Sequence, residues 1–240
     1  LMRALRADIQ DNCGCSDSDL SGFDFEWIEG DDELTFHDCT IRNTRIKGDA
    51  LGASTWQNCK FIDCEFVGAE LRDASFIGCV FFEGATTSST AFRFCDLKRT
   101  KFTNCNMSLL KMAGCEAYDM QVDSCQMRGI EIENTKFVQA AGKRRFSAAH
   151  FTKCRLAGAI LDQLDFTSCE FDGCDFSNAT LNNARMVNTV LRDCDLYNIE
   201  AVGADFNGAD LRGSDLHGFR LADLAGCLGM KMSFGQPHHL

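Results

Sequence analysis

The sequence predicts an all-β solenoid whose coils have four faces and about 20 residues each. Two observations predict this fold. An apolar residue recurs at every fifth position through three long blocks of the chain, and cysteines recur at intervals of twenty. A period of five fits neither a strand nor a helix, whose side chains repeat every 2.0 and 3.6 residues. A unit this short cannot bury its own apolar side, so it must stack on its neighbours.

The apolar positions, here called centres, fall in blocks at residues 36–81, 92–137 and 146–221, and each of the 36 centres is Phe, Leu, Ile, Met, Val, Trp or Ala. The residue two places before a centre is small or apolar in most repeats. We expect both positions to point into a narrow core and the other three residues to face water. Twelve of the fifteen cysteines take the minus-two position: Cys39, Cys59, Cys64, Cys79, Cys95, Cys105, Cys115, Cys125, Cys154, Cys169, Cys174 and Cys194.

The coil size follows from the spacing of these cysteines. Cys39, Cys59 and Cys79 are 20 residues apart, and the same interval recurs later in the chain. Four five-residue faces then make one coil, with like residues stacked at the strand spacing of about 4.8 Å. The 36 centres predict nine coils. Leu20 and Phe25 are expected to be centres one residue out of phase.

Composition limits the kinds of function. The net charge is −11, which disfavours direct binding to nucleic acid or to an anionic membrane. The sequence has a single proline, Pro237, no apolar run of membrane-spanning length and no signal-peptide pattern at its start. We therefore expect a cytoplasmic protein, in which most cysteines are thiols.

Two breaks in the five-residue period predict projecting loops, near 82–91 and 138–145. They divide the expected solenoid, residues 16–221, which follows an N-terminal extension (1–15) and precedes a C-terminal cap (222–240). Because loops on rigid scaffolds often carry function, we expect partner-binding residues there. The candidates are Glu83, Thr86, Thr87, Ser88, Gln139, Lys143, Arg144 and Arg145.

Acidic residues concentrate at the two ends of the chain. Residues 1–35 hold ten acidic and two basic residues. Residues 146–221 hold eleven acidic and six basic residues. In the last block Asp175, Asp195 and Asp215 precede their centres at 20-residue intervals, which predicts a column on one face. Asp165, Glu170, Asp205 and Asp210 are expected on adjacent faces. A short Asp at this position can also hydrogen-bond nearby backbone, so the pattern has a structural explanation as well.

The cysteines do not indicate a metal site. Their spacing is five, ten or twenty residues, and they share the inward position with Ala, Thr and Ser. A buried thiol is a small hydrophobe, and we expect packing roles, including for Cys227 in the tail. Cys13 and Cys15 lie outside the clear repeat, where a redox or metal role stays open. No catalytic motif is present, so we predict neither an enzyme nor a cofactor.

Segments such as "AELRD", "ADLRGSDL" and "CEFDGCDFSNATL" resemble the pentapeptide-repeat proteins, whose fold is a right-handed quadrilateral β-helix. Two loops that flank ten repeats, the irregular centre Ala117 and the tail "LHGFRLADLAGCLGMKM" are similar to the Qnr group within that family. The resemblance implies a DNA-mimicking protein that binds DNA gyrase and topoisomerase IV and protects them from quinolones. It also implies a homodimer formed through the tail, with Leu221, Leu224, Leu228 and Met230 as candidates.

Two other functions stay open. The rod could be an interaction scaffold or effector domain with a different protein partner, or a metal or redox protein that uses its cysteines. A pull-down from a cell lysate that recovers another protein without a gyrase subunit would favour the scaffold. Metal found by elemental analysis would favour the metal or redox protein.

Overall fold

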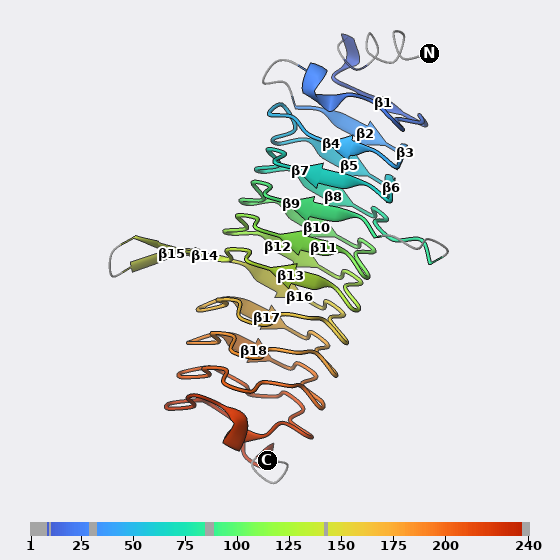
Figure 1. Cartoon of the computed structure of the whole chain (residues 1–240). Coiled ribbons are helices and arrows are strands. Elements are labelled where there is room, and N and C mark those ends of the chain that lie inside the picture. The colour runs from blue at the N-terminus through green and yellow to red at the C-terminus, as the bar shows by residue number, and fades with distance from the viewer. Residues whose placement is uncertain (1–8, 10, 29–32, 85–88, 142–143, 237–240) are drawn as a thin grey trace.

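The computed structural model describes residues 9, 11–28, 33–84, 89–141 and 144–236, and the side chains of 140–147 are not described. Parallel strands stack in coils along one axis, from the N-terminus to the C-terminus (Figure 1). The widest wall, here called wall one, has nine strands. They are β1 (Gly14–Ser16), β2 (Thr35–His37), β5 (Thr55–Gln57), β8 (Ser75–Ile77), β10 (Lys101–Thr103), β12 (Gln121–Asp123), β16 (His150–Thr152), β17 (Glu170–Asp172) and β18 (Val190–Arg192). The predicted all-β solenoid is confirmed, with one strand of this wall per coil.

Three further walls complete each coil. Wall two starts with β3 (Thr40–Arg42) and β6 (Lys60–Ile62) and continues as single bridges through Asp175, Asp195 and Asp215. Wall three holds β4 (Arg45–Ile46), β7 (Glu65–Val67), β9 (Ala91–Arg93), β11 (Lys111–Ala113) and β13 (Glu131–Glu133). Wall four is made of bridges such as Glu70 with Asp96 and Arg185 with Asp205. Short 3-10 helices lie at Phe25–Trp27 (η1) and Leu221–Asp223 (η2).

The strand register confirms the 20-residue coil. Thr35 pairs with Thr55, and Thr55 with Ser75. The residue two places after a centre bends the chain, because it adopts the left-handed conformation: Asp38, Asn58 and Asp73 have φ of 54°, 54° and 61°. Asn, Asp and Gly adopt that conformation most readily. Asn, Asp or Gly stands two places after most centres, and this pattern is a second sequence signal of the four-sided coil.

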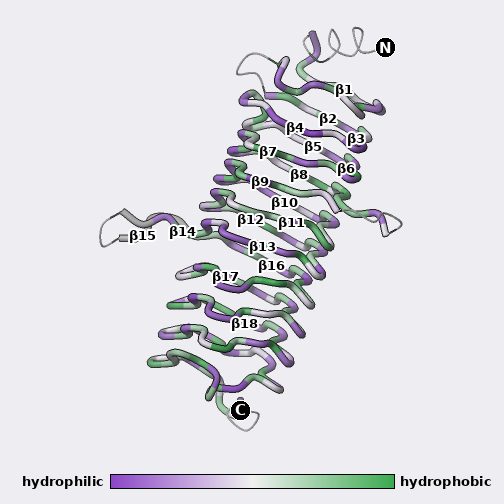
Figure 2. Tube along the Cα trace, in the orientation of Figure 1, coloured by the Kyte–Doolittle hydropathy of each residue, from purple (hydrophilic) through white to green (hydrophobic). Residues whose placement is uncertain are grey.

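Centre side chains stack on one another from coil to coil. The rings of Phe36 and Trp56 lie 4.0 Å apart at 14°, and those of Phe66 and Phe92 lie 4.4 Å apart at 9°. All twelve minus-two cysteines are buried. Figure 2 shows the alternation of polar and apolar residues along the coils. The predicted inward and outward positions are therefore confirmed along most of the rod, including the exposed Asp172, while Ile62, Thr167 and Asp210 are buried at outward positions.

Hydrogen bonds explain why Cys, Thr and Ser share the minus-two position. The Cys59 thiol donates to the carbonyl of Phe36, the centre of the preceding coil, at 3.4 Å. The Thr90 and Ser214 hydroxyls donate in the same way, to Phe61 at 2.7 Å and to Leu191 at 2.6 Å. Burial raises the pKa of the Cys64 thiol to about 11. These side chains are thus packing groups that also donate to backbone oxygens.

Both insertions lie where the period breaks. Lys101 pairs with Ser75, 26 positions earlier, and His150 pairs with Gln121, 29 positions earlier, so the coils gain six and nine residues. The second insertion is an antiparallel hairpin of β14 (Val138–Ala141) and β15 (Arg144–Ala148), which projects from the rod (Figure 1). The predicted loop ended too early, and Phe146 was wrongly counted as a centre. It belongs to β15, and the last block begins at Phe151.

The solenoid extends slightly further at both ends than the predicted boundaries. At the N-terminal end, β1 pairs with β2, so Cys15 belongs to the first strand of wall one. Leu20 and Phe25 are buried, as expected for centres. At the other end, bridges from Asp205 to Gly226 and from Asp210 to Lys231 add part of a further coil. The tail therefore continues the fold before the chain reaches its last described residues.

Candidate partner-binding surface

The acidic column consists of Asp175, Asp195 and Asp215, which occupy successive levels of wall two. Parallel bridges join Asp175 to Asp195 and Asp195 to Asp215, as the 20-residue spacing predicted. Arg155 stands on the preceding level of the same wall. Since neighbouring levels are about 4.8 Å apart, three carboxylates follow one line along the rod.

Each aspartate of the column also holds a turn. The Asp175 carboxylate accepts the backbone N–H of Ser177 at 2.9 Å, and Asp195 and Asp215 accept those of Tyr197 and His217 at the same distance. In all three it is Oδ1 that accepts. The structural explanation of the pattern is thus confirmed. These hydrogen bonds leave the aspartates on the outer side of the wall, where the Asp215 side chain is 48% exposed.

The other predicted acidic residues have different surroundings. Asp165 and Asp205 lie on wall four with Arg185 on the level between them, and Arg185 Nε is 4.0 Å from Asp165 Oδ2. Glu170, on wall one, lies 3.3 Å from His150 Nδ1. These residues do not join the acidic column.

Asp210 was wrongly placed on an exposed acidic face. Its side chain is only 6% exposed, and its Oδ2 lies 2.7 Å from both Arg192 and Arg212. The hydrogen bond from Arg212 is the main reason that the pKa of Asp210 lies well below its usual range, with Arg192 adding to the effect. Asp210 is therefore a neutralised structural carboxylate that joins two coils.

The middle coils pair their charges across levels. Lys98 lies 2.7 Å from Glu116, and Lys111 lies 2.9 Å from Glu131. Arg99 Nε lies 2.7 Å from Asp73. Acids and bases alternate between neighbouring coils here, so this part of the rod neutralises much of its own charge.

The two insertions differ in how they meet the rod. Glu83, at the base of the first, turns back to wall two, where it lies 3.2 Å from Lys60 and 3.9 Å from Arg42. Gln139 is exposed on β14. Arg144 and Arg145 lie on β15, in the hairpin that projects from the coils. The remaining predicted contacts, Thr86, Thr87, Ser88 and Lys143, lie outside the described residues.

Apolar side chains remain exposed at the C-terminal end. Leu228 is 86% exposed and Phe234 is fully exposed. Leu221, Leu224 and Met230 are partly buried against the last coils. Cys227 is exposed, so the expectation that it packs in the core was wrong. The outward direction of residues 227 and 228 could not be read from the five-residue period, which ends at Leu221.

Neither metal ligation nor membrane spanning is indicated by the described part of the chain. No three His, Cys, Asp or Glu side chains gather there in a way that could hold a metal ion. No helix in the described ranges is both long and apolar enough to cross a membrane.

Comparisons with known proteins agree with this architecture. Residues 144–225 match the model of the pentapeptide repeat region family. None of the curated protein sequences matches the chain. Among solved structures, a trypsin-treated variant of QnrB1, a plasmid-mediated fluoroquinolone resistance protein, superposes with a TM-score of 0.77 at 21% identity, covering 82% of this chain and 92% of that one. Full-length QnrB1 superposes with a TM-score of 0.73 at 20% identity. This match covers 94% of this chain and 96% of QnrB1.

The matched family region covers the last solenoid block, and the structural likeness extends over the earlier coils as well. At 21% identity that likeness establishes the fold. The period of five, the four-walled coil and the family match lead to the same conclusion. Residues 144–225 are a pentapeptide repeat region, and the chain as a whole has a Qnr-like fold.

Proposed function

We propose that this protein is a non-enzymatic topoisomerase-protection protein of the Qnr type, which binds DNA gyrase or topoisomerase IV and protects it from quinolone-type inhibitors. The carrying observation is the acidic column on a rod whose fold is that of QnrB1. A row of carboxylates along one wall presents negative charges in a line, as the phosphates of a DNA strand do. A basic DNA-binding groove gains free energy by neutralising such a row.

The two insertions support the same proposal. They leave the rod at its middle coils, where charges are paired, and the projecting hairpin carries Arg144 and Arg145. In this proposal the acidic column occupies the groove and the hairpin contacts the enzyme beside it. The apolar side chains at Leu228 and Phe234 would form the contact between two copies of the chain, because large exposed apolar side chains favour association.

The test is DNA supercoiling by gyrase in the presence of ciprofloxacin. Added protein should restore supercoiling. A variant lacking residues 139–147 should not, although it keeps its fold, because removing nine residues returns the spacing from Gln121 to His150 to one normal coil. No rescue by the intact protein would refute the proposal. Equal rescue by the deletion variant would show that the hairpin is not needed for protection.

A matched pair of charge variants tests the acidic column. Asp175, Asp195 and Asp215 are changed together to Asn, which keeps the oxygen that accepts the turn hydrogen bond. The control changes the exposed Asp172, Asp193 and Glu200, which lie elsewhere on the same half, to Asn, Asn and Gln. Both lose three charges, and only the column variant should lose protection. Equal loss in both would show that net charge, rather than the column, matters.

A further inference from the structure

Cys15 holds an unusual place in the core of the first coil. In strand β1 it pairs with Phe36 of β2, and the next strands of wall one carry Trp56 and Phe76 at the same position. A small thiol therefore stands where the following coils place a large aromatic ring. Unlike the minus-two cysteines, Cys15 is only partly buried.

The sulfur of Cys15 lies beside a second sulfur. Cys15 Sγ and Cys39 Sγ are 3.7 Å apart, and the Cys39 thiol also lies 3.6 Å from the Cys15 carbonyl. Cys39 is fully buried. The two residues are 24 positions apart in the chain and belong to neighbouring coils.

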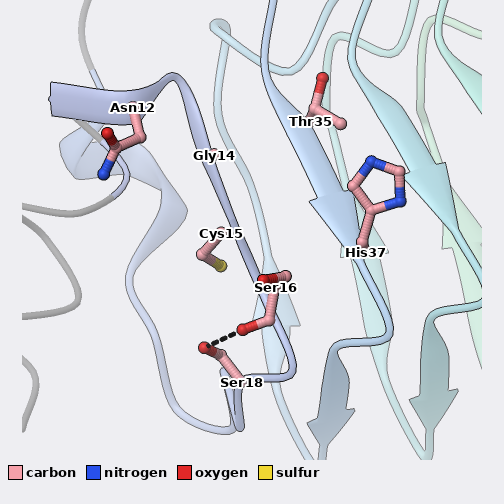
Figure 3. Close-up of a pocket in the computed structure, with 7 residues that line it drawn as sticks. All are labelled: Asn12, Gly14, Cys15, Ser16, Ser18, Thr35 and His37. Atoms are coloured by element: carbon pink, nitrogen blue, oxygen red, sulfur yellow. Dashed lines mark hydrogen bonds between the residues drawn. The ribbon is translucent and has the colours of Figure 1, made fainter.

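A cavity of about 480 Å³ reaches this end of wall one (Figure 3). Its lining residues are mostly small and polar: Asn12, Gly14, Cys15, Ser16, Ser18, Thr35 and His37. The pair thus combines a thiol that a small polar oxidant can approach with a buried thiol that can resolve the product.

We propose that Cys15 and Cys39 are an oxidation site for small peroxides, at which they form a disulfide. The Cys15 sulfur attacks the peroxide, the O–O bond breaks, and Cys15 becomes a sulfenic acid while the first water leaves. The Cys39 sulfur then attacks Cys15 Sγ, the S–O bond breaks, and the oxygen leaves as a second water. Two thiols are oxidised and one hydrogen peroxide is reduced to two waters. Closing the sulfur separation to about 2.05 Å needs a shift of less than about 2 Å.

The product would lock the end of the rod. A bond between Cys15 and Cys39 ties β1 to the corner that follows β2, in addition to their hydrogen bonds. The oxidised protein should therefore unfold at a higher temperature than the reduced protein, because the cross-link restricts the unfolded chain. This inference does not depend on the proposed binding to a topoisomerase.

The experiment uses the full chain with Cys227→Ser, which removes the exposed thiol that could join two molecules. Reduced protein is treated with hydrogen peroxide at about pH 8.5, near the ordinary pKa of a cysteine thiol, because thiolates are the reactive species. Remaining thiols are alkylated, and trypsin with a Glu-specific protease cuts at Glu26, Glu29 and Glu33, between the two cysteines. Mass spectrometry should find the two fragments joined through Cys15 and Cys39, and a reductant should separate them.

Three variants make the result decisive. Cys15→Ser and Cys39→Ser should each lose the joined fragments and the rise in unfolding temperature, while Cys13→Ser should keep both. Cys39→Ser is expected to fold, since Ser214 takes the same minus-two position and donates the same hydrogen bond in the last block. A bond between Cys13 and Cys15, a bond between Cys39 and Cys59, or no bond in the folded protein would overturn the proposal.

Discussion

The middle coils and the C-terminal coils share one backbone plan but use their charges differently. Between Glu65 and Glu131, acids and bases face one another across levels, as Lys98 and Glu116 do at 2.7 Å. On wall two of the C-terminal half, aspartates occupy three successive levels. The comparison indicates that a repeat of five residues sets the shape of the rod, while the residues at its outward positions decide which wall stays charged for a partner.

The largest effect is expected in the core, which both regions share. Phe66→Ala should lower the free energy of unfolding by about 3–5 kcal/mol, because it removes a fully buried ring stacked 4.4 Å from Phe92. Phe171→Ala, in the C-terminal half, should lose a similar amount. The exposed Asp172→Ala is the control and should change little. Denaturant unfolding checks this, and equal losses at Phe171 and Asp172 would contradict the assignment of inward and outward positions.

Asp210 is an acid of the C-terminal half that is both buried and paired, whereas Asp165 and Glu170 meet Arg185 and His150 at more exposed positions. Asp210→Asn should reduce the free energy of unfolding at neutral pH by about 1–3 kcal/mol, because two arginines lose a charged acceptor. The folded-state pKa of Asp210 lies below its unfolded value, so its contribution is present above about pH 4 and is lost as the pH falls below that. Unfolding of both proteins, followed from about pH 7 down to about pH 2, should show the difference shrinking in acid. A difference that stays constant would contradict the pairing.

The exposed pairs of the middle coils should matter least for stability. Asp73→Asn breaks the contact with Arg99, and both side chains are about half exposed. The expected loss is about 0–1 kcal/mol, and high salt should remove it, because water and ions screen exposed pairs. A loss as large as that at Asp210 would show that the middle coils depend on their charges for folding.

Much of the fold could be predicted from the sequence. Each wall of a coil is built from five residues, so the inward positions repeat every five residues and each coil has about 20. The hairpin was predicted too short because Phe146 is aromatic and falls in phase by chance, so it could not be told from a centre. Asp210 was misplaced because its partners, Arg192 and Arg212, come together on it only through the coil register and the local turn. Cys39 could not be identified as the partner of Cys15, since Cys15 was assigned to the N-terminal extension and joins the first coil only through the pairing of β1 with β2.

The most direct test of the account is the binding of purified protein to gyrase, measured in competition with duplex DNA. The intact protein should displace DNA. Changing Asp175, Asp195 and Asp215 together to Asn should weaken binding about tenfold or more, since each lost charge removes part of the attraction. The control variant, in which the exposed acids at positions 172, 193 and 200 are replaced by their amides, should bind as the intact protein does. Equal binding by the column variant and the control, or no competition with DNA, would contradict the central claim that the acidic column of wall two is the surface a topoisomerase recognises.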